Sequence, residues 1–144
     1  MAIQFHPKVG QILMCDFTEG FKAPEMVKKR PVLVISPSMK SRPNLVTVIP
    51  LSTTEPNPKE PYHYSLPAKS MPKTRHFQSK ETWLKGDMVY VVGFHRLDLI
   101  RLNERCPNTG KRKYFDTRLG REQMKAVYGC LLASLNLSHL AKYV

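Results

Sequence analysis

Long apolar runs alternate with polar segments along the first two thirds of the chain, and these runs predict strands. They span residues 11–17, 31–35 (PVLVI), 45–51 (LVTVIPL) and 88–92 (MVYVV). Runs that are almost continuously apolar and rich in β-branched residues are typical of strands buried on both faces. A shorter segment, 62–66, lies among prolines and is expected to form an edge strand, because proline is tolerated at sheet edges.

The C-terminal part of the chain has a helical period instead. Between 121 and 135, apolar side chains recur at the spacing of one helix face, at Met124, Val127, Tyr128, Leu131 and Leu135. The segments at about 55–84 and 103–115 are polar, basic or rich in proline, and they predict longer loops. Several strands followed by one late helix predict an α+β fold: a small SH3-like or barrel-like, mostly antiparallel β-sheet with a C-terminal helix.

Length and charge limit the classes of function. The chain has 144 residues, which fits a single domain over 1–144. Its 23 Lys and Arg residues against 11 Asp and Glu residues give a net charge of +12, which attracts polyanions, with nucleic acid first and an acidic protein second. The N-terminus lacks the apolar core of a secretory signal, and no run approaches the ~18 apolar residues that span a bilayer. We therefore expect a cytoplasmic protein without membrane contact.

The cysteine pattern and the absence of metal motifs narrow the chemistry further. The three cysteines, Cys15, Cys106 and Cys130, are widely spaced and fit neither a disulfide framework nor a CxxC site, so we expect them to be packing residues. The sequence has no HExxH, CxxC or phosphate-binding glycine motif, and we expect neither a metal ion nor a cofactor.

Some polar and aromatic side chains remain as candidates for contact with a polyanion. His95 follows the apolar run 88–92 beside Arg96, and a histidine there suits proton transfer near neutral pH. Aromatic side chains near lysines can stack on unpaired bases. Phe21 is the favoured candidate because of its lysine-rich loop; the others near predicted loops are Tyr62, Tyr64, Trp83 and Phe94.

Segments in a particular order resemble the MazF/PemK toxins. GQILMCDF at 10–17 resembles their opening strand, and KKRPVLVIS at 28–36 with VTVIPLSTT at 46–54 resembles their paired central strands. KGDMVYVVGFHRLDLIRL at 85–102 is similar to the strand and turn before their basic loop, and RLGREQMKAVYGCLLASLNL at 118–137 to their C-terminal helix.

The resemblance implies a type II toxin: a barrel-like homodimer that cleaves single-stranded RNA at specific sequences without metal and is neutralised by an antitoxin with an acidic or extended segment. Arg30 matches the arginine of the family's RP element, and Ser52 matches the threonine of its P-L-T element, with Thr53 beside it. The expected catalytic residues are therefore Arg30, Ser52, Thr53 and His95. The expected substrate-binding residues are Phe21, Lys28, Lys29, Thr54 and Arg96.

Two other functions remain open, because a fold does not determine a function. One is a non-catalytic nucleic-acid-binding barrel, favoured by Tyr90, Val92 and Gly93, which stand where some members of the family carry Arg, Asp and Gln. The other is a gyrase-poison-type toxin that binds a protein. Such a toxin is expected to end in an exposed target-binding segment, whereas LNLSHLAKYV at 135–144 is expected to be a packed helix end.

Overall fold

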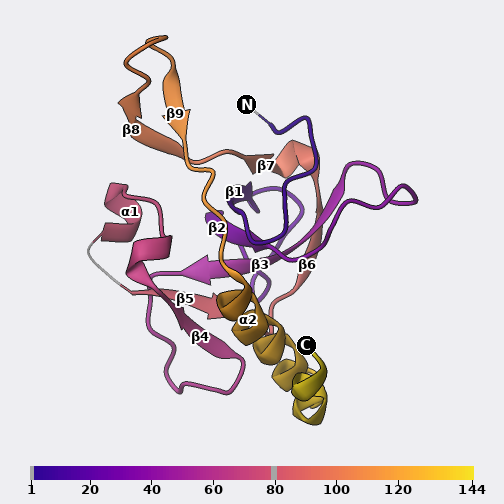
Figure 1. Cartoon of the computed structure of the whole chain (residues 1–144). Coiled ribbons are helices and arrows are strands. Elements are labelled where there is room, and N and C mark those ends of the chain that lie inside the picture. Colours follow the sequence, from indigo (N-terminus) through magenta and orange to yellow (C-terminus); the bar gives the residue numbers. More distant parts are fainter. Residues whose placement is uncertain (1, 79–80) are drawn as a thin grey trace.

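A computed structural model describes residues 2–78 and 81–144, and Figure 1 shows a sheet with one long helix near the C-terminus. The strands are β1 (Ile12–Asp16), β2 (Lys29–Val34), β3 (Leu45–Ser52), β4 (His63–Leu66), β5 (Thr82–Lys85), β6 (Tyr90–Gly93), β7 (Leu97–Asp98), β8 (Arg101–Arg105) and β9 (Arg112–Tyr114). The helices are η1 (Ala68–Ser70), α1 (Arg75–Gln78), η2 (Phe94–Arg96), α2 (Arg121–Ser134) and η3 (Ser138–Tyr143), where η denotes a 3-10 helix.

The main sheet has the strand order β4-β5-β3-β2-β1-β7, with β6 also paired to β3, and all of these pairings are antiparallel. The strands predicted at 11–17, 31–35, 45–51 and 62–66 are confirmed, each with ends within two residues of the prediction. The last of them is β4, which lies at the sheet edge as expected. The strand predicted at 88–92 begins later, at Tyr90.

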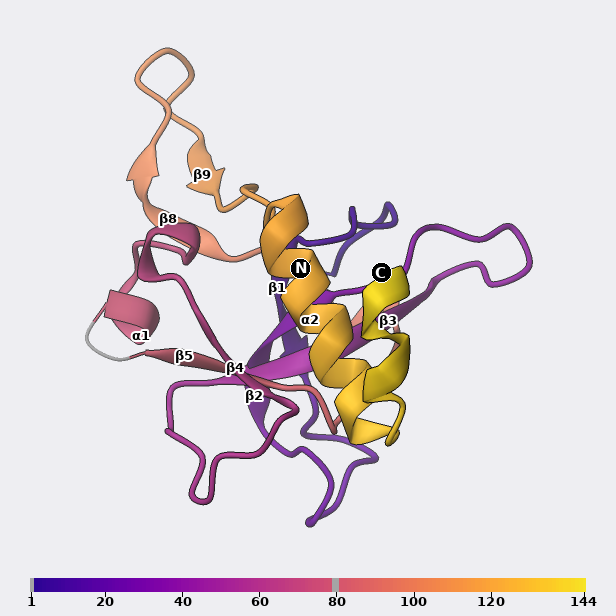
Figure 2. The same cartoon turned by 60° about the horizontal axis from the view of Figure 1, so that its bottom comes forward.

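Two apolar cores lie on the two faces of this sheet, because successive side chains of a strand point to opposite faces. On one face, Leu33 and Ile49 pack in a cluster with Met124 and Val127 of α2, the helix that lies across the sheet in Figure 2. The other face holds a second cluster: Leu13, Cys15, Phe17, Met26, Val32, Val34, Val46, Val48, Val92 and Leu97. The prediction that the runs at 31–35 and 45–51 are buried on both faces is therefore confirmed at their centres.

The predicted helix at 121–135 is confirmed as α2, and the observed α+β architecture matches the predicted fold class. Its buried side chains are Met124, Val127 and Cys130, whereas Leu135 is 60% exposed, so the predicted face is wrong at that end. The reason is that the helix ends at Ser134 and the chain turns back through Asn136, which has a φ of 60°. The last residues form a 3-10 helix beside α2 (Figure 2) and not an α-helical end.

The predictions of loops at 55–84 and 103–115 are wrong in part. Near the end of the loop predicted at about 55–84, the chain forms β5, which pairs with both β4 and β3. Its Trp83 is only 8% exposed. Residues 79 and 80 of that segment lie outside the described residues. At 103–115, β8 and β9 form a hairpin that projects from the body (Figures 1 and 2). These strands are short, and β8 and β9 are mostly exposed, so they have no apolar alternation for a sequence pattern to detect.

Gly86 and Gly129 offer a matched test of the packing between α2 and the sheet. A Cβ at Gly86 would lie 2.7 Å from the Tyr62 carbonyl oxygen and 2.9 Å from the Cys130 Cβ, whereas a Cβ at Gly129 meets nothing within 4 Å. We expect Gly86→Ala to lower the free energy of unfolding by about 1–3 kcal/mol through overpacking. Gly129→Ala, inside the helix, should raise it by about 1 kcal/mol. Urea unfolding measures both, and equal effects of the two substitutions would contradict the close contact at Gly86.

Candidate functional site

Arg30, Cys15 and Ser52 lie on the three central strands β2, β1 and β3. Arg30 is paired with Cys15, whereas the β2–β3 ladder ends at Val32 and Pro50, two residues before Arg30 and Ser52, and Ser52 is paired with Trp83 of β5. Arg30 is half-buried, and its Nε is buried with no hydrogen-bond partner among the described residues. We call Cys15, Arg30 and Ser52 the Arg30 row. The guanidinium stays positively charged at neutral pH and has other N–H donors besides the one on Nε.

The hydroxyl residues at the end of β3 lie beside this row. Ser52 is 5% exposed, and its Oγ accepts a hydrogen bond from the Thr54 N–H at 3.1 Å. Accepting this bond leaves the hydroxyl proton of Ser52 able to donate. Thr53 is half-buried and Thr54 is exposed. The Ser52 hydroxyl thus stabilises the turn at the end of β3, as serine often does at strand ends, and its own proton remains available for another acceptor.

Cys15 is not equipped to act as a nucleophile. Burial raises the pKa of its thiol to about 12, so the sulfur stays protonated at neutral pH. Cys130 is also buried and Cys106 is half-buried. The prediction that the cysteines are packing residues is confirmed for Cys15 and Cys130.

The next residues along β1 and β2 are charged. Asp16 is paired with Lys29, and alternation along the strand places Lys29 on the opposite face from Arg30. The Asp16 carboxylate accepts hydrogen bonds from the hydroxyl and the N–H of Thr18, which hold its pKa below the usual range for aspartate. Asp16 therefore remains an anion at neutral pH. Lys28 is exposed and has a φ of 73°.

Arg96 holds the loop of residues 17–28, which connects β1 to β2 and ends two residues before Arg30 in the sequence. Its Nη1 donates to the carbonyl oxygens of Asp16, at 3.0 Å, and Glu19, at 2.8 Å. Its Cζ lies 4.7 Å from the centroid of the Phe21 ring, within the range of a cation–π contact. The sequence predicted that Arg96 binds the substrate and that Phe21 stacks on a base. In the structure these two side chains contact each other.

Tyr90, the first residue of β6, also holds this loop. Its hydroxyl accepts a hydrogen bond from the Met26 N–H at 2.8 Å, and its ring lies 5.3 Å from Phe17 and 5.5 Å from Phe21, between centroids. Sequence analysis identified Tyr90 only as a departure from the family pattern. Its role was not predictable, because its partners are far away along the chain and no local motif joins them.

His95 lies in a groove next to the β1–β7 edge. The groove has a volume of about 390 Å³, and the residues that line it are Ala2, Met14, Cys15, Asp16, Lys29, His95, Arg96, Leu97, Asp98, Leu99, Ile100 and Arg101. The predicted site residues therefore fall into two groups. Arg30 and Ser52 belong to the Arg30 row, whereas Lys29, His95 and Arg96 line the groove; Cys15 belongs to both.

No metal-binding cluster of three His, Cys, Asp or Glu side chains is found in the described ranges 2–78 and 81–144. Among the described helices, none is long and apolar enough to cross a membrane.

Nearly the whole chain is similar to known proteins. Residues 8–135 match the family model of the PemK-like, MazF-like toxins of type II toxin–antitoxin systems. YifN of Escherichia coli (strain K12) is 29% identical over 153 aligned residues, which cover 94% of this chain and 96% of that protein. A protein of Haemophilus influenzae is 32% identical over 108 residues, covering 67% of this chain and 73% of its own.

Solved structures agree in fold. MazF from Deinococcus radiodurans superimposes with a TM-score of 0.59 at 16% identity, over 92% of this chain and 99% of that chain. An endoribonuclease from Mycobacterial species, solved in complex with its cognate antitoxin, superimposes with a TM-score of 0.57 at 18% identity, over 92% and 97% of the two chains. Because the family model covers nearly the whole chain, this protein belongs to the PemK-like, MazF-like toxins of type II toxin–antitoxin systems.

Proposed function

We propose that this protein is the toxin of its system and cleaves single-stranded RNA, as a sequence-specific endoribonuclease of the cytoplasm that needs no metal ion. The observation that carries the proposal is the Arg30 row. A half-buried arginine, Arg30, follows a basic loop on β2, and the hydroxyl of Ser52 lies at the end of the neighbouring strand β3. Rigid donors of this kind stabilise the negative charge that a phosphate gains during cleavage.

Each step of metal-free cleavage has a candidate residue. The ribose 2′-oxygen attacks the neighbouring phosphorus, the bond to the 5′-oxygen breaks, and the products are a cyclic phosphate and a 5′-hydroxyl. Arg30 offsets the charge on the phosphate, and Ser52 or Thr53 donates a hydrogen bond to it. His95 accepts the proton of the 2′-hydroxyl and, as an imidazolium, gives it to the leaving 5′-oxygen. Cys15, the cross-strand partner of Arg30, lines the groove that contains His95, so one residue of β1 connects the two groups.

Cleavage of a random-sequence RNA pool in EDTA tests the proposal directly. We expect cleavage to persist in the chelator and to leave 5′-hydroxyl ends, because side chains supply every charge and proton that the reaction needs. Mapping of the ends and labelling by a kinase that requires a 5′-hydroxyl measure this. Activity that vanishes in EDTA and returns with magnesium would contradict the mechanism. RNA binding without any cleavage would favour the non-catalytic alternative.

The proposed protein partner is an antitoxin with an acidic segment. The net charge of +12 supports this, since a basic surface attracts an acidic chain over a distance. The affinity of a purified pair should fall as salt concentration rises. An affinity independent of salt would indicate a mainly apolar contact.

The proposed assembly is a homodimer. The apolar stripe of α2 does not need a second chain as cover, because Met124 and Val127 pack on the protein's own sheet. The support now comes from β3 and β6, where Leu45 is 40% exposed and Val91 is 49% exposed on adjacent strands. Light scattering that gives the 16.6 kDa mass of one chain would exclude a stable dimer.

A further inference from the structure

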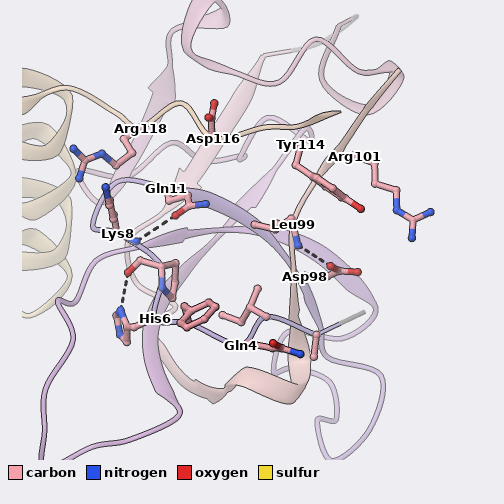
Figure 3. Close-up of a pocket in the computed structure, with 14 residues that line it drawn as sticks. Gln4, His6, Lys8, Gln11, Asp98, Leu99, Arg101, Tyr114, Asp116 and Arg118 are labelled. Atoms are coloured by element: carbon pink, nitrogen blue, oxygen red, sulfur yellow. Dashed lines mark hydrogen bonds between the residues drawn. The ribbon is translucent and has the colours of Figure 1, made fainter. Parts of the chain in front are cut away.

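A second and larger cavity lies between the N-terminal segment 2–8 and the base of the β8–β9 hairpin (Figure 3). Its volume is about 860 Å³, within the range of about 300–1,000 Å³ that is usual for ligand sites. Backbone hydrogen bonds hold its walls: the Ile3 N–H donates to the Leu97 carbonyl at 3.0 Å, and the Leu119 N–H donates to the Gly10 carbonyl at 3.0 Å. The cavity is therefore formed before any ligand binds.

The lining combines three kinds of side chain. Phe5 is 84% exposed and Tyr114 is 40% exposed, so the surfaces of both aromatic rings are accessible to a ligand. Arg101 is paired with Tyr114 across the hairpin, so both side chains lie on the same face of it. Asp116, from the chain just after β9, adds a carboxylate (Figure 3).

These three kinds of group match two parts of a nucleotide, the base and the phosphate. An exposed aromatic ring stacks on an unpaired base, and a guanidinium binds a phosphate. A carboxylate accepts hydrogen bonds from the amino group of a base, and so distinguishes bases that carry one from bases that do not. Lys8 and Arg118, which also line the cavity, raise the positive charge at its edge.

The cavity continues the groove that contains His95. Ala2, Asp98, Leu99 and Arg101 line both hollows, so the two adjoin, and we refer to them together as the channel along β1. The channel passes from Cys15, opposite Arg30, to Gln11, which lines the larger cavity. At a rise of about 3.4 Å per residue, this is a path of about 14 Å, which a few nucleotides can span.

The hairpin itself extends the positive surface beyond the cavity. Its cationic side chains are Arg101, Arg105, Lys111, Arg112 and Lys113, all exposed, and Glu104 pairs with Lys113 at 3.6 Å. Such an arm attracts the phosphates of a strand that leaves the cavity.

We propose that this cavity binds one unpaired nucleotide of the RNA substrate, to one side of the phosphate that is cleaved. The base stacks on Tyr114 and Phe5, Arg101 binds a neighbouring phosphate, and Asp116 makes the site selective for the base. The cavity thus contributes to the sequence preference of cleavage. This inference rests on RNA being the substrate, as proposed above.

Binding measurements on the Arg30→Ala protein, in which cleavage is expected to be about 10²-fold slower, test the inference; a 2′-deoxy substitution throughout the probe gives the same measurement with a strand that cannot be cleaved. The probe is a random-sequence pool of short single-stranded RNA, with anisotropy for affinity and sequencing of the bound fraction for base preference. In this background Tyr114→Ala is expected to weaken binding by about 5- to 150-fold, the range for loss of one stacked base, and to remove the preference at one position. Phe5→Ala, at a side chain too exposed to affect folding, should act in the same direction.

Tyr143→Ala is the matched control, because Tyr143 is 75% exposed on η3 and does not line the cavity. If Tyr114→Ala and Phe5→Ala both match this control in affinity and in base preference, the inference is overturned. The proposed function is tested separately, by cleavage with Arg30 intact. A wild type that binds through the cavity but does not cleave contradicts only the proposed function. A Tyr114→Ala protein that cleaves at the wild-type sites with the wild-type KM contradicts only the cavity.

Discussion

Arg30→Ala is expected to lower the rate of RNA cleavage by about 10²-fold or more, the scale of losing one preorganised donor at a developing charge. The side chain is half-buried in β2, directly after the lysines of the basic loop, and its guanidinium is a fixed positive charge. RNA binding should fall much less, because the net charge of +12 spreads the phosphate attraction over many other cations. Single-turnover cleavage and anisotropy measure the two effects separately.

The control variants at this position separate charge from geometry. Arg30→Lys keeps the charge but cannot make the two-pronged contact with a phosphate, so it should recover only part of the rate. Ser52→Ala should show the same pattern in a milder form, since Thr53 lies beside it. Full cleavage by Arg30→Ala, with an unchanged circular dichroism spectrum, would exclude this mechanism. If cleavage and binding fall together, Arg30 is an anchor for RNA, and His95→Ala becomes the next test.

Arg96→Ala is expected to release the loop of residues 17–28. The substitution removes two hydrogen bonds from a charged group, at about 1.5–3 kcal/mol each, and a cation–π contact of about 0.5–1 kcal/mol. Because Arg96 is only half-buried, water compensates for part of this loss, and we expect the free energy of unfolding to fall by about 2–3 kcal/mol. Trypsin cleavage after Lys22, in the released loop, should become much faster.

Two comparisons show whether Arg96 acts through the loop or on the RNA. Lys40→Ala, at an exposed position between β2 and β3, is the control and should leave the rate of trypsin cleavage in the loop unchanged. If Arg96 binds a phosphate directly, Arg96→Ala lowers the slope of log affinity against log salt by about one. If it acts only through the loop, the slope stays the same while cleavage slows. Wild-type rates of proteolysis in Arg96→Ala would refute the role in the loop.

Sequence alone was sufficient for the central strands, the long helix and the family. The runs at 31–35 and 45–51 and the helical period at 121–135 are local signals, because one segment contains enough apolar residues to define its own period. Arg30 and Ser52 were also accessible, since each lies next to such a run. The two strands that carry them, β2 and β3, are consecutive in the chain and pair with each other.

The tertiary structure decided the rest, because those features depend on contacts between distant residues. β5 and the β8–β9 hairpin are too short to have a period of their own, and pairing with other strands defines them. Arg96 reaches the Asp16 and Glu19 carbonyl oxygens across 80 and 77 residues, and Tyr90 reaches Met26 across 64. The channel along β1 likewise needs the N-terminal segment, β7 and the hairpin together. A sequence pattern records which side chains are apolar or charged, but the hydrogen bonds that join a loop to a remote arginine arise only when the sheet has closed.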